Sequence, residues 1–127
     1  MEVKTSLKYL RMAPRKVRMV VDLVRGMSVE SAERYLAFSE RKAAKPILKL
    51  LKSVIANAKN NFNFDEKKIK TLYIKKIFVD EGPKLKRWRP VSRGSAHPIQ
   101  KKTSHVSIIL EEKLPKARVN SKKIKKI

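Results

Sequence analysis

One long segment of the chain, residues 82–104, combines residue types that can bind nucleic acid. It contains no acidic residue, and its cations flank Trp88. Lysine and arginine neutralise phosphates and release counterions, and a tryptophan among arginines can stack on unpaired bases. The candidate nucleic-acid-binding cations of this segment are Lys84, Lys86, Arg87, Arg89, Arg93, Lys101 and Lys102.

Two further groups of cations lie outside this segment. One group lies in and just before the first predicted helix and consists of Arg11, Arg15, Lys16, Arg18 and Arg25. The other is the acid-free tail, residues 113–127. The whole chain has 33 lysines and arginines against 11 acidic residues, which gives a formal charge of +22. A charge this large opposes compaction unless a polyanion binds. Because the cations form three separate clusters, we expect the protein to contact several phosphate backbones and not a single groove of one nucleic acid.

Each cationic feature also has a plainer interpretation. The helical cations could form a solvated face, Trp88 could fold back onto a core, and the tail could serve only solubility or targeting. His105 begins a strand pattern and is better explained as a structural hydrogen-bonding residue than as a catalyst.

The sequence offers little to an enzyme or a metal site. It has no cysteine and two histidines, so thiolate zinc sites and histidine cages are excluded, and no cofactor is expected. Asp80 and Glu81 are adjacent, and neighbouring strand residues point to opposite faces, so they cannot share acid–base chemistry. No apolar run approaches the ~20 residues that span a bilayer, and the N-terminus lacks a signal peptide, so we expect a cytoplasmic protein.

Hydrophobic periodicity predicts the elements that would position these cations. Residues 3–11 alternate as a strand, with Val3, Thr5, Leu7 and Tyr9 on one side. A helix should begin at Pro14 and end before Gly26, and a second should begin after Ser28. Ser39 could cap a third helix that stops near residues 60–61, with Pro46 either in its first turn or at a kink.

Residues 69–79 and 105–111 alternate as strands, and the first places Leu72, Ile74 and Phe78 on one face. The predicted fold is α+β, with three helices packed on a small three-stranded antiparallel sheet and a long protruding β-hairpin over residues 80–104. Such a hairpin would reach about 35 Å from the body, at ~3.3 Å per residue. We expect one domain over residues 1–112, followed by a disordered tail from 113 to 127.

Several motifs resemble those of one known family. Residues 13–18 and 21–26 are similar to the first helix of large-subunit ribosomal protein twenty-two, and residues 49–61 to its long helix. Residues 77–83, followed by Lys86-Arg87, Pro90, Arg93-Gly94 and residues 102–105, carry the strongest match. The resemblance covers about residues 5–111 in one order and is of the bacterial type. The family usually has serine at the position of Ala13.

The resemblance implies a non-enzymatic component of the large ribosomal subunit that binds ribosomal RNA, aids assembly and extends its hairpin along the nascent-chain tunnel. It adds Thr103, Ser104 and His105 to the candidate RNA-binding residues. The implied tunnel-lining tip consists of Leu85, Lys86, Arg87, Trp88, Arg89, Pro90, Val91, Ser92, Arg93, Gly94, Ser95 and Ala96. The implied partners are ribosomal RNA, neighbouring ribosomal proteins and the nascent polypeptide.

Two other functions are weighed against this one. An architectural DNA-binding protein could insert Trp88 from a β-arm into a minor groove, although such proteins usually dimerise and no spare apolar face is evident here. We therefore expect no homo-oligomer. A membrane-surface peptide would need an amphipathic helix with an aromatic belt, which the sequence lacks, so no membrane partner is expected.

Overall fold

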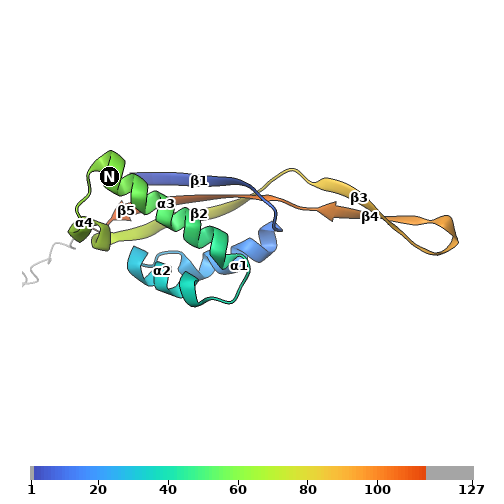
Figure 1. Ribbon diagram of the computed structural model, residues 1–127, viewed down its shortest axis with the longest axis horizontal. Coiled ribbons are helices and arrows are strands. Elements are labelled where there is room, and N and C mark those ends of the chain that lie inside the picture. Colours follow the sequence, from blue (N-terminus) through green and yellow to red (C-terminus); the bar gives the residue numbers. More distant parts are fainter. Residues whose placement is uncertain (1, 114–127) are drawn as a thin grey trace, which may run out of the picture.

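The computed structural model describes residues 2–113, in which a body of helices and strands carries one long arm (Figure 1). The body contains helices α1 (Pro14–Val24), α2 (Val29–Phe38), α3 (Ala44–Phe62) and α4 (Glu66–Thr71). Its sheet is formed by β1 (Glu2–Leu10), β2 (Leu72–Glu81) and β5 (Ser104–Glu112). The arm is a separate two-stranded sheet of β3 (Leu85–Pro90) and β4 (Ala96–Lys101).

The body sheet is antiparallel with the order β1-β5-β2, so the last strand lies in the middle. The α+β prediction is confirmed, with the three main helices packed on a three-stranded sheet. Alternate residues of β5, including Val106, Ile108 and Leu110, are buried against the helices. Helix α3 packs on β1 and β5, and α1 packs against β2. The core therefore lies between one face of the sheet and the helices.

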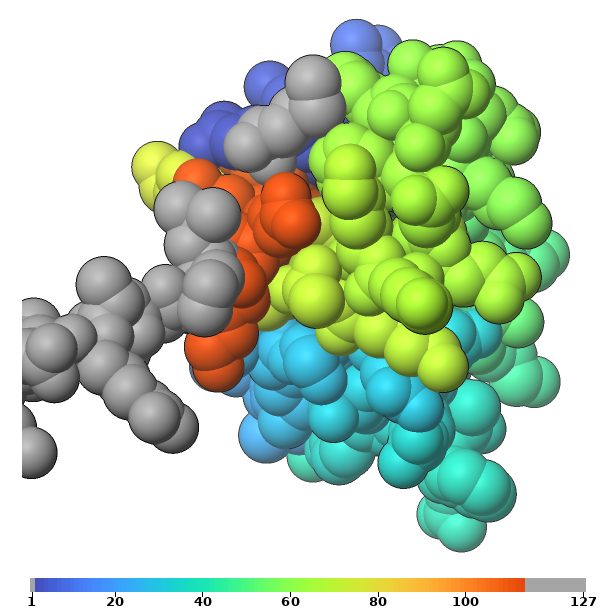
Figure 2. All heavy atoms as spheres, turned by 90° about the vertical axis from the view of Figure 1, so that its left-hand side faces the viewer, coloured from blue at the N-terminus to red at the C-terminus, as the bar shows by residue number. Residues whose placement is uncertain are grey.

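The sequence pattern does not predict the short helix α4, because residues 69–71 are part of the alternating segment that predicts the following strand. Figure 2 shows the end of the body opposite the arm, where α2, α3 and α4 lie beside the end of β5. Here Lys113 N–H donates to the Thr71 carbonyl oxygen at 3.1 Å, which continues the chain past β5. The predicted disorder from residue 114 onward falls outside the described residues. None of the helices within residues 2–113 is long and apolar enough to cross a membrane.

Two β-bulges overturn the predicted strand faces. In β2 the register shifts between Ile74 and Lys76, so Leu72, Ile74, Ile77 and Val79 are buried while Phe78 is 40% exposed. The prediction had placed Phe78 on the same face as Leu72 and Ile74. An extra residue on one strand reverses which alternate positions face the core.

The bulge in β1 has the same effect near the strand's end. The register shifts between Leu7 and Leu10, and Tyr9 takes a positive φ of 57° and is 64% exposed. Tyr9 was predicted to face the same side as Leu7. Leu10 packs against the core instead.

The start of α3 also differs from the prediction. Ser39 is the C-cap of α2, and α3 begins at Ala44 after an N-cap at Ala43 with no side-chain cap. Pro46 is therefore in the first turn, where a missing N–H removes no helical hydrogen bond. The helix continues to Phe62, one residue beyond the predicted stop at Asn60-Asn61, and its C-cap residue Asn63 is left-handed with φ 50°.

One ionic cluster ties the three body strands together. The Lys75 Nζ donates to Glu111 Oε1 at 2.9 Å and to Glu2 Oε1 at 2.5 Å. The hydroxyl of Tyr73 donates to the other Glu111 oxygen at 2.7 Å. The hydrogen bonds from Lys75 and then Tyr73 lower the pKa of Glu111, while the Glu111 bond raises the pKa of Tyr73. The bulge residue Lys75 thus links β2 to β1 across β5.

Replacing Ala13 with serine should stabilise the fold. Ala13 is the N-cap of α1, its backbone is extended with φ −63° and ψ 135°, and it provides no side-chain cap. A serine hydroxyl there would accept a hydrogen bond from the N–H of Arg15, and we expect about 1 kcal/mol of added unfolding free energy. Urea unfolding monitored by circular dichroism measures this change in unfolding free energy.

Ala43→Ser is the matched control, because Ala43 is the N-cap of α3 but has helical φ and ψ and is buried. A hydroxyl there cannot reach the cap geometry, so no gain is expected. Equal stabilisation by both serines, or none at Ala13, would contradict the capping argument.

Candidate nucleic-acid interface

Strand pairing divides the arm's side chains between two faces. Directly paired residues share a face, and successive residues alternate. One face therefore carries Arg87 and Arg89 opposite Ile99 and His97, together with the pair of Leu85 and Lys101. The other face carries Trp88 opposite Pro98, flanked by the pairs Lys86–Gln100 and Pro90–Ala96. The sequence-predicted cations and the tryptophan thus lie on one ribbon but mostly on opposite sides.

The arm has no core of its own within the described residues. Every residue of β3 is exposed, and Trp88 is 68% exposed. None of the buried core residues lies between residues 80 and 105. This excludes the interpretation in which Trp88 folds back onto the body. The arm extends away from the body along its length (Figure 1).

The tip is a tight turn, and Arg93 within it is exposed. Arg93 and Gly94 both have positive φ, 59° and 68°, and Ser95 N–H donates to the Ser92 carbonyl oxygen at 3.3 Å. Positive φ at both central residues is typical of the type I′ turn that joins antiparallel strands. A second bond from Val91 N–H to the Ser95 carbonyl oxygen, at 3.0 Å, closes the loop.

The junction between body and arm is built from two of the residues predicted to bind RNA. The hydroxyl of Thr103 donates to the Pro83 carbonyl oxygen at 2.7 Å, and Gly82 N–H donates to the Thr103 carbonyl oxygen at 2.9 Å. Thr103 and Ser104 are both buried. The Thr103 hydroxyl therefore holds the arm's base, whereas Ser104 Oγ is buried without a hydrogen-bond partner, and neither side chain presents a surface to a ligand.

His105 also has a structural partner. Its Nδ1 accepts a hydrogen bond from Tyr9 N–H at 2.9 Å, and the two rings meet edge to face with centroids 4.9 Å apart. The tyrosine N–H is free for this bond because the β1 bulge takes it out of the strand ladder. This arrangement agrees with the structural interpretation of His105 made from the sequence.

Replacing Gly82 with alanine should destabilise the junction. A Cβ built on Gly82 would lie 2.3 Å from Thr103 Oγ1 and 3.3 Å from His105 Cε1. The threonine must rotate and lose its bond to Pro83, so we expect a loss of about 1–2 kcal/mol in unfolding free energy. Urea unfolding of the full chain measures the change.

Thr103→Ala tests the cause of that loss. It removes the clashing oxygen, so Gly82→Ala should cost about 1 kcal/mol less in the Thr103→Ala background than alone. Strictly additive effects of the two substitutions would show that the clash with Thr103 is not the reason.

The cations of α1 divide into two groups. Arg11, Arg15 and Lys16 are exposed near the start of the helix. Arg18 and Arg25 instead donate through Nη2 to the carbonyl oxygens of Val79 and Ile77, each at 3.0 Å. Arg25 also pairs with Asp22 at 3.0 Å.

These two arginines complete the open edge of the sheet. Strand β2 is an edge strand, and the segment after α1 pairs with its first half through Gly26 N–H to Ile74 O at 3.1 Å and Ile74 N–H to Met27 O at 2.9 Å. Arg25 and Arg18 then satisfy carbonyl groups farther along the same strand. Covering an edge in this way prevents pairing with other chains. Both guanidinium groups remain exposed, so they also add positive charge beside the arm's base.

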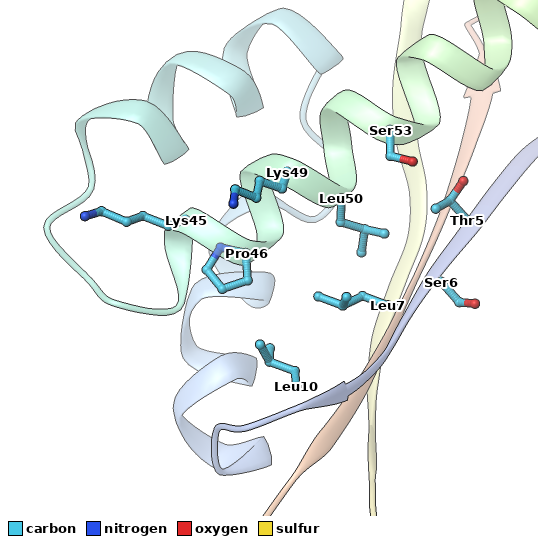
Figure 3. Close-up of a pocket in the computed structure, with 9 residues that line it drawn as sticks. All are labelled: Thr5, Ser6, Leu7, Leu10, Lys45, Pro46, Lys49, Leu50 and Ser53. Atoms are coloured by element: carbon cyan, nitrogen blue, oxygen red, sulfur yellow. The ribbon is translucent and has the colours of Figure 1, made fainter.

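Sequence reasoning missed the cations at the start of α3. Lys45 and Lys49 are exposed and line a groove between α3 and β1 (Figure 3). The sequence does place these two lysines four residues apart, on one face of a helix. The groove beside them depends on how α3 packs over β1 and has no local sequence pattern.

Comparisons with known proteins agree with the resemblance. A match to the family "Ribosomal protein L22p/L17e" covers residues 5–111. The chain is 47% identical over 113 residues to the large ribosomal subunit protein uL22 of Syntrophus aciditrophicus, covering 89% of this chain and all of the relative. It is 48% identical to the uL22 proteins of Clostridium novyi and Thermus thermophilus, with 89% of this chain covered and 99% and 97% of the relatives. The chain therefore belongs to the ribosomal protein L22p/L17e family of large-subunit ribosomal proteins.

Proposed function

We propose that this protein is a structural constituent of the large ribosomal subunit, within the cytoplasm, and that it binds large-subunit ribosomal RNA and aids assembly. Membership of the family supports the ribosomal role. The observation that carries RNA binding is the acid-free arm, which is exposed along its length and holds cations on both faces. Within residues 2–113, Lys84 is the one arm cation with an acidic partner, Glu81 at 3.9 Å, so the other arm cations remain available to a polyanion.

The proposed RNA interface has two parts. The arm supplies Lys84, Lys86, Arg87, Arg89, Arg93, Lys101 and Lys102, and the start of α1 supplies Arg11, Arg15 and Lys16. Arg18 and Arg25 contribute charge while holding the β2 edge. Thr103 holds the arm's base through Pro83, and His105 binds Tyr9 of β1. Phosphate contacts of this kind fix position without reading sequence.

We also propose that the arm's tip, residues 85–96, lines the path of the nascent polypeptide and that neighbouring large-subunit proteins contact the body. The tip projects farthest from the core, so its side chains can enter a confined space while the body stays on the surface (Figure 1).

Sedimentation of a native lysate tests the ribosomal role. The protein should migrate with large subunits and leave them only when the RNA is digested. Migration with chromosomal DNA would instead support an architectural DNA-binding role. A photoreactive residue at Ser92 should crosslink to stalled nascent chains, whereas one at Asn60 of α3 should not. Equal crosslinking from both positions would contradict the proposed place of the tip.

A further inference from the structure

The groove between β1 and the first half of α3 takes no part in the interface described above. Its volume is about 410 Å³, within the range of ~300–1,000 Å³ typical of small-ligand sites. In Figure 3, Leu7 and Leu10 of β1 point toward Leu50 and Pro46 of α3 across it. Leu50 is buried, but Leu7, Leu10 and Pro46 are only partly buried. The groove therefore exposes apolar surface that the core does not cover.

Hydroxyl groups border one end of this apolar surface. Thr5 and Ser53 lie on facing elements, β1 and α3 (Figure 3). The Thr5 Oγ1 accepts a hydrogen bond from Asn57 Nδ2 at 2.9 Å, which leaves its own O–H free to donate. A ligand with polar edges would find donors and acceptors there.

Positive charge borders the other end. Lys45 and Lys49 belong to the first turns of α3, and Lys45 extends away from the leucines in Figure 3. Neither lysine forms a salt bridge within residues 2–113. No acidic residue lines the groove. A ligand of the groove should therefore have an apolar group with a negative charge next to it.

We propose that the groove binds a single unpaired nucleotide of the large-subunit ribosomal RNA, and this inference rests on the proposed RNA-binding function. The base would pack on the leucines with its polar edge toward Thr5 and Ser53, and the adjoining phosphates would lie near Lys45 and Lys49. Flipped-out bases are held in this way between apolar side chains, and lysines neutralise the backbone. A partner helix would instead lay apolar anchors at i, i+3, i+4 and i+7 along a longer groove.

Ser53→Trp tests the proposal, because Ser53 is exposed and an indole there would fill the groove without changing charge. Asn60→Trp is the control, since Asn60 is an exposed, uncharged residue of the same helix that does not line the groove. The probe is a transcript of the large-subunit ribosomal RNA of Thermus thermophilus, whose uL22 is 48% identical. We expect Ser53→Trp to weaken binding about tenfold, the size of one lost base contact, with an unchanged salt slope. Asn60→Trp should bind like the wild type.

A photoreactive residue at Ser53 provides the second measurement. In assembled subunits it should crosslink to one short stretch of ribosomal RNA. If the wild type binds the transcript but Ser53→Trp binds equally well, or if the crosslink goes to a protein, the groove proposal is wrong and the RNA-binding function stands. If the wild type does not bind the transcript with a salt-dependent affinity, the proposed function itself fails.

Discussion

A variant in which Asn-Gly replaces residues 84–100 keeps the body folded and still enters large subunits. None of the buried core residues lies in the deleted segment. The junction bonds of Thr103 to Pro83 and Gly82 remain, and an Asn-Gly turn can join antiparallel strands. The shorter connection also lowers the loop-closure cost by up to ~1 kcal/mol. The helical circular dichroism should therefore match that of the full chain, and the unfolding midpoint should be equal or slightly higher.

The consequence of losing the arm should appear in the ribosome. The body's cations at Arg11, Arg15 and Lys16 remain, so we expect near-normal occupancy in purified subunits. If the tip lines the nascent-chain path, its removal widens that path and changes the pausing of some nascent chains. An unfolded variant would show that the arm belongs to the core. A folded variant absent from subunits would show that the arm supplies the main RNA contact.

Binding of the isolated protein to large-subunit ribosomal RNA should fall steeply with salt. If about eight phosphates are neutralised, at ~0.7 counterions each, the slope of log K against log salt is near −6. With this slope, raising the salt from 50 to 200 mM should lower the affinity by roughly three to four powers of ten. Filter binding over that range measures it. A slope shallower than about −2 would mean that most of the cations are only solvated.

A pair of charge-matched variants shows where the phosphates bind. The first changes Arg11, Arg15 and Lys16 to glutamine, and the second changes Lys67, Lys68 and Lys70 of α4, at the end of the body opposite the arm. Each removes three exposed positive charges. We expect the first to reduce the slope by about 2 and the second to leave it nearly unchanged. Equal reductions would indicate a response to total charge and not to a defined interface.

Local patterns along the chain are enough to specify the kinds of elements and the presence of the arm. Helical stripes such as Val17, Val20, Val21 and Val24 predicted α1, because a 3.6-residue period is a local property of the chain. The long segment without acids or apolar periodicity could not join the core, so it had to project. The motifs of residues 13–26, 49–61 and 77–105, in that order, together indicated the family.

Which cationic side chains remain without a structural role depends instead on tertiary packing. The bulges at Lys75 and Tyr9 reversed the predicted faces, and bulges depend on the strand opposite and not on local periodicity. Arg18 looks in the sequence like Arg15, yet it binds a β2 carbonyl group because α1 packs along that edge. The burial of Thr103 and the groove beside Pro46 arise in the same way, from segments far apart in sequence. A local sequence pattern does not contain the tertiary contacts of a residue. Those contacts decide whether a cation has a structural hydrogen bond or is free to bind a ligand.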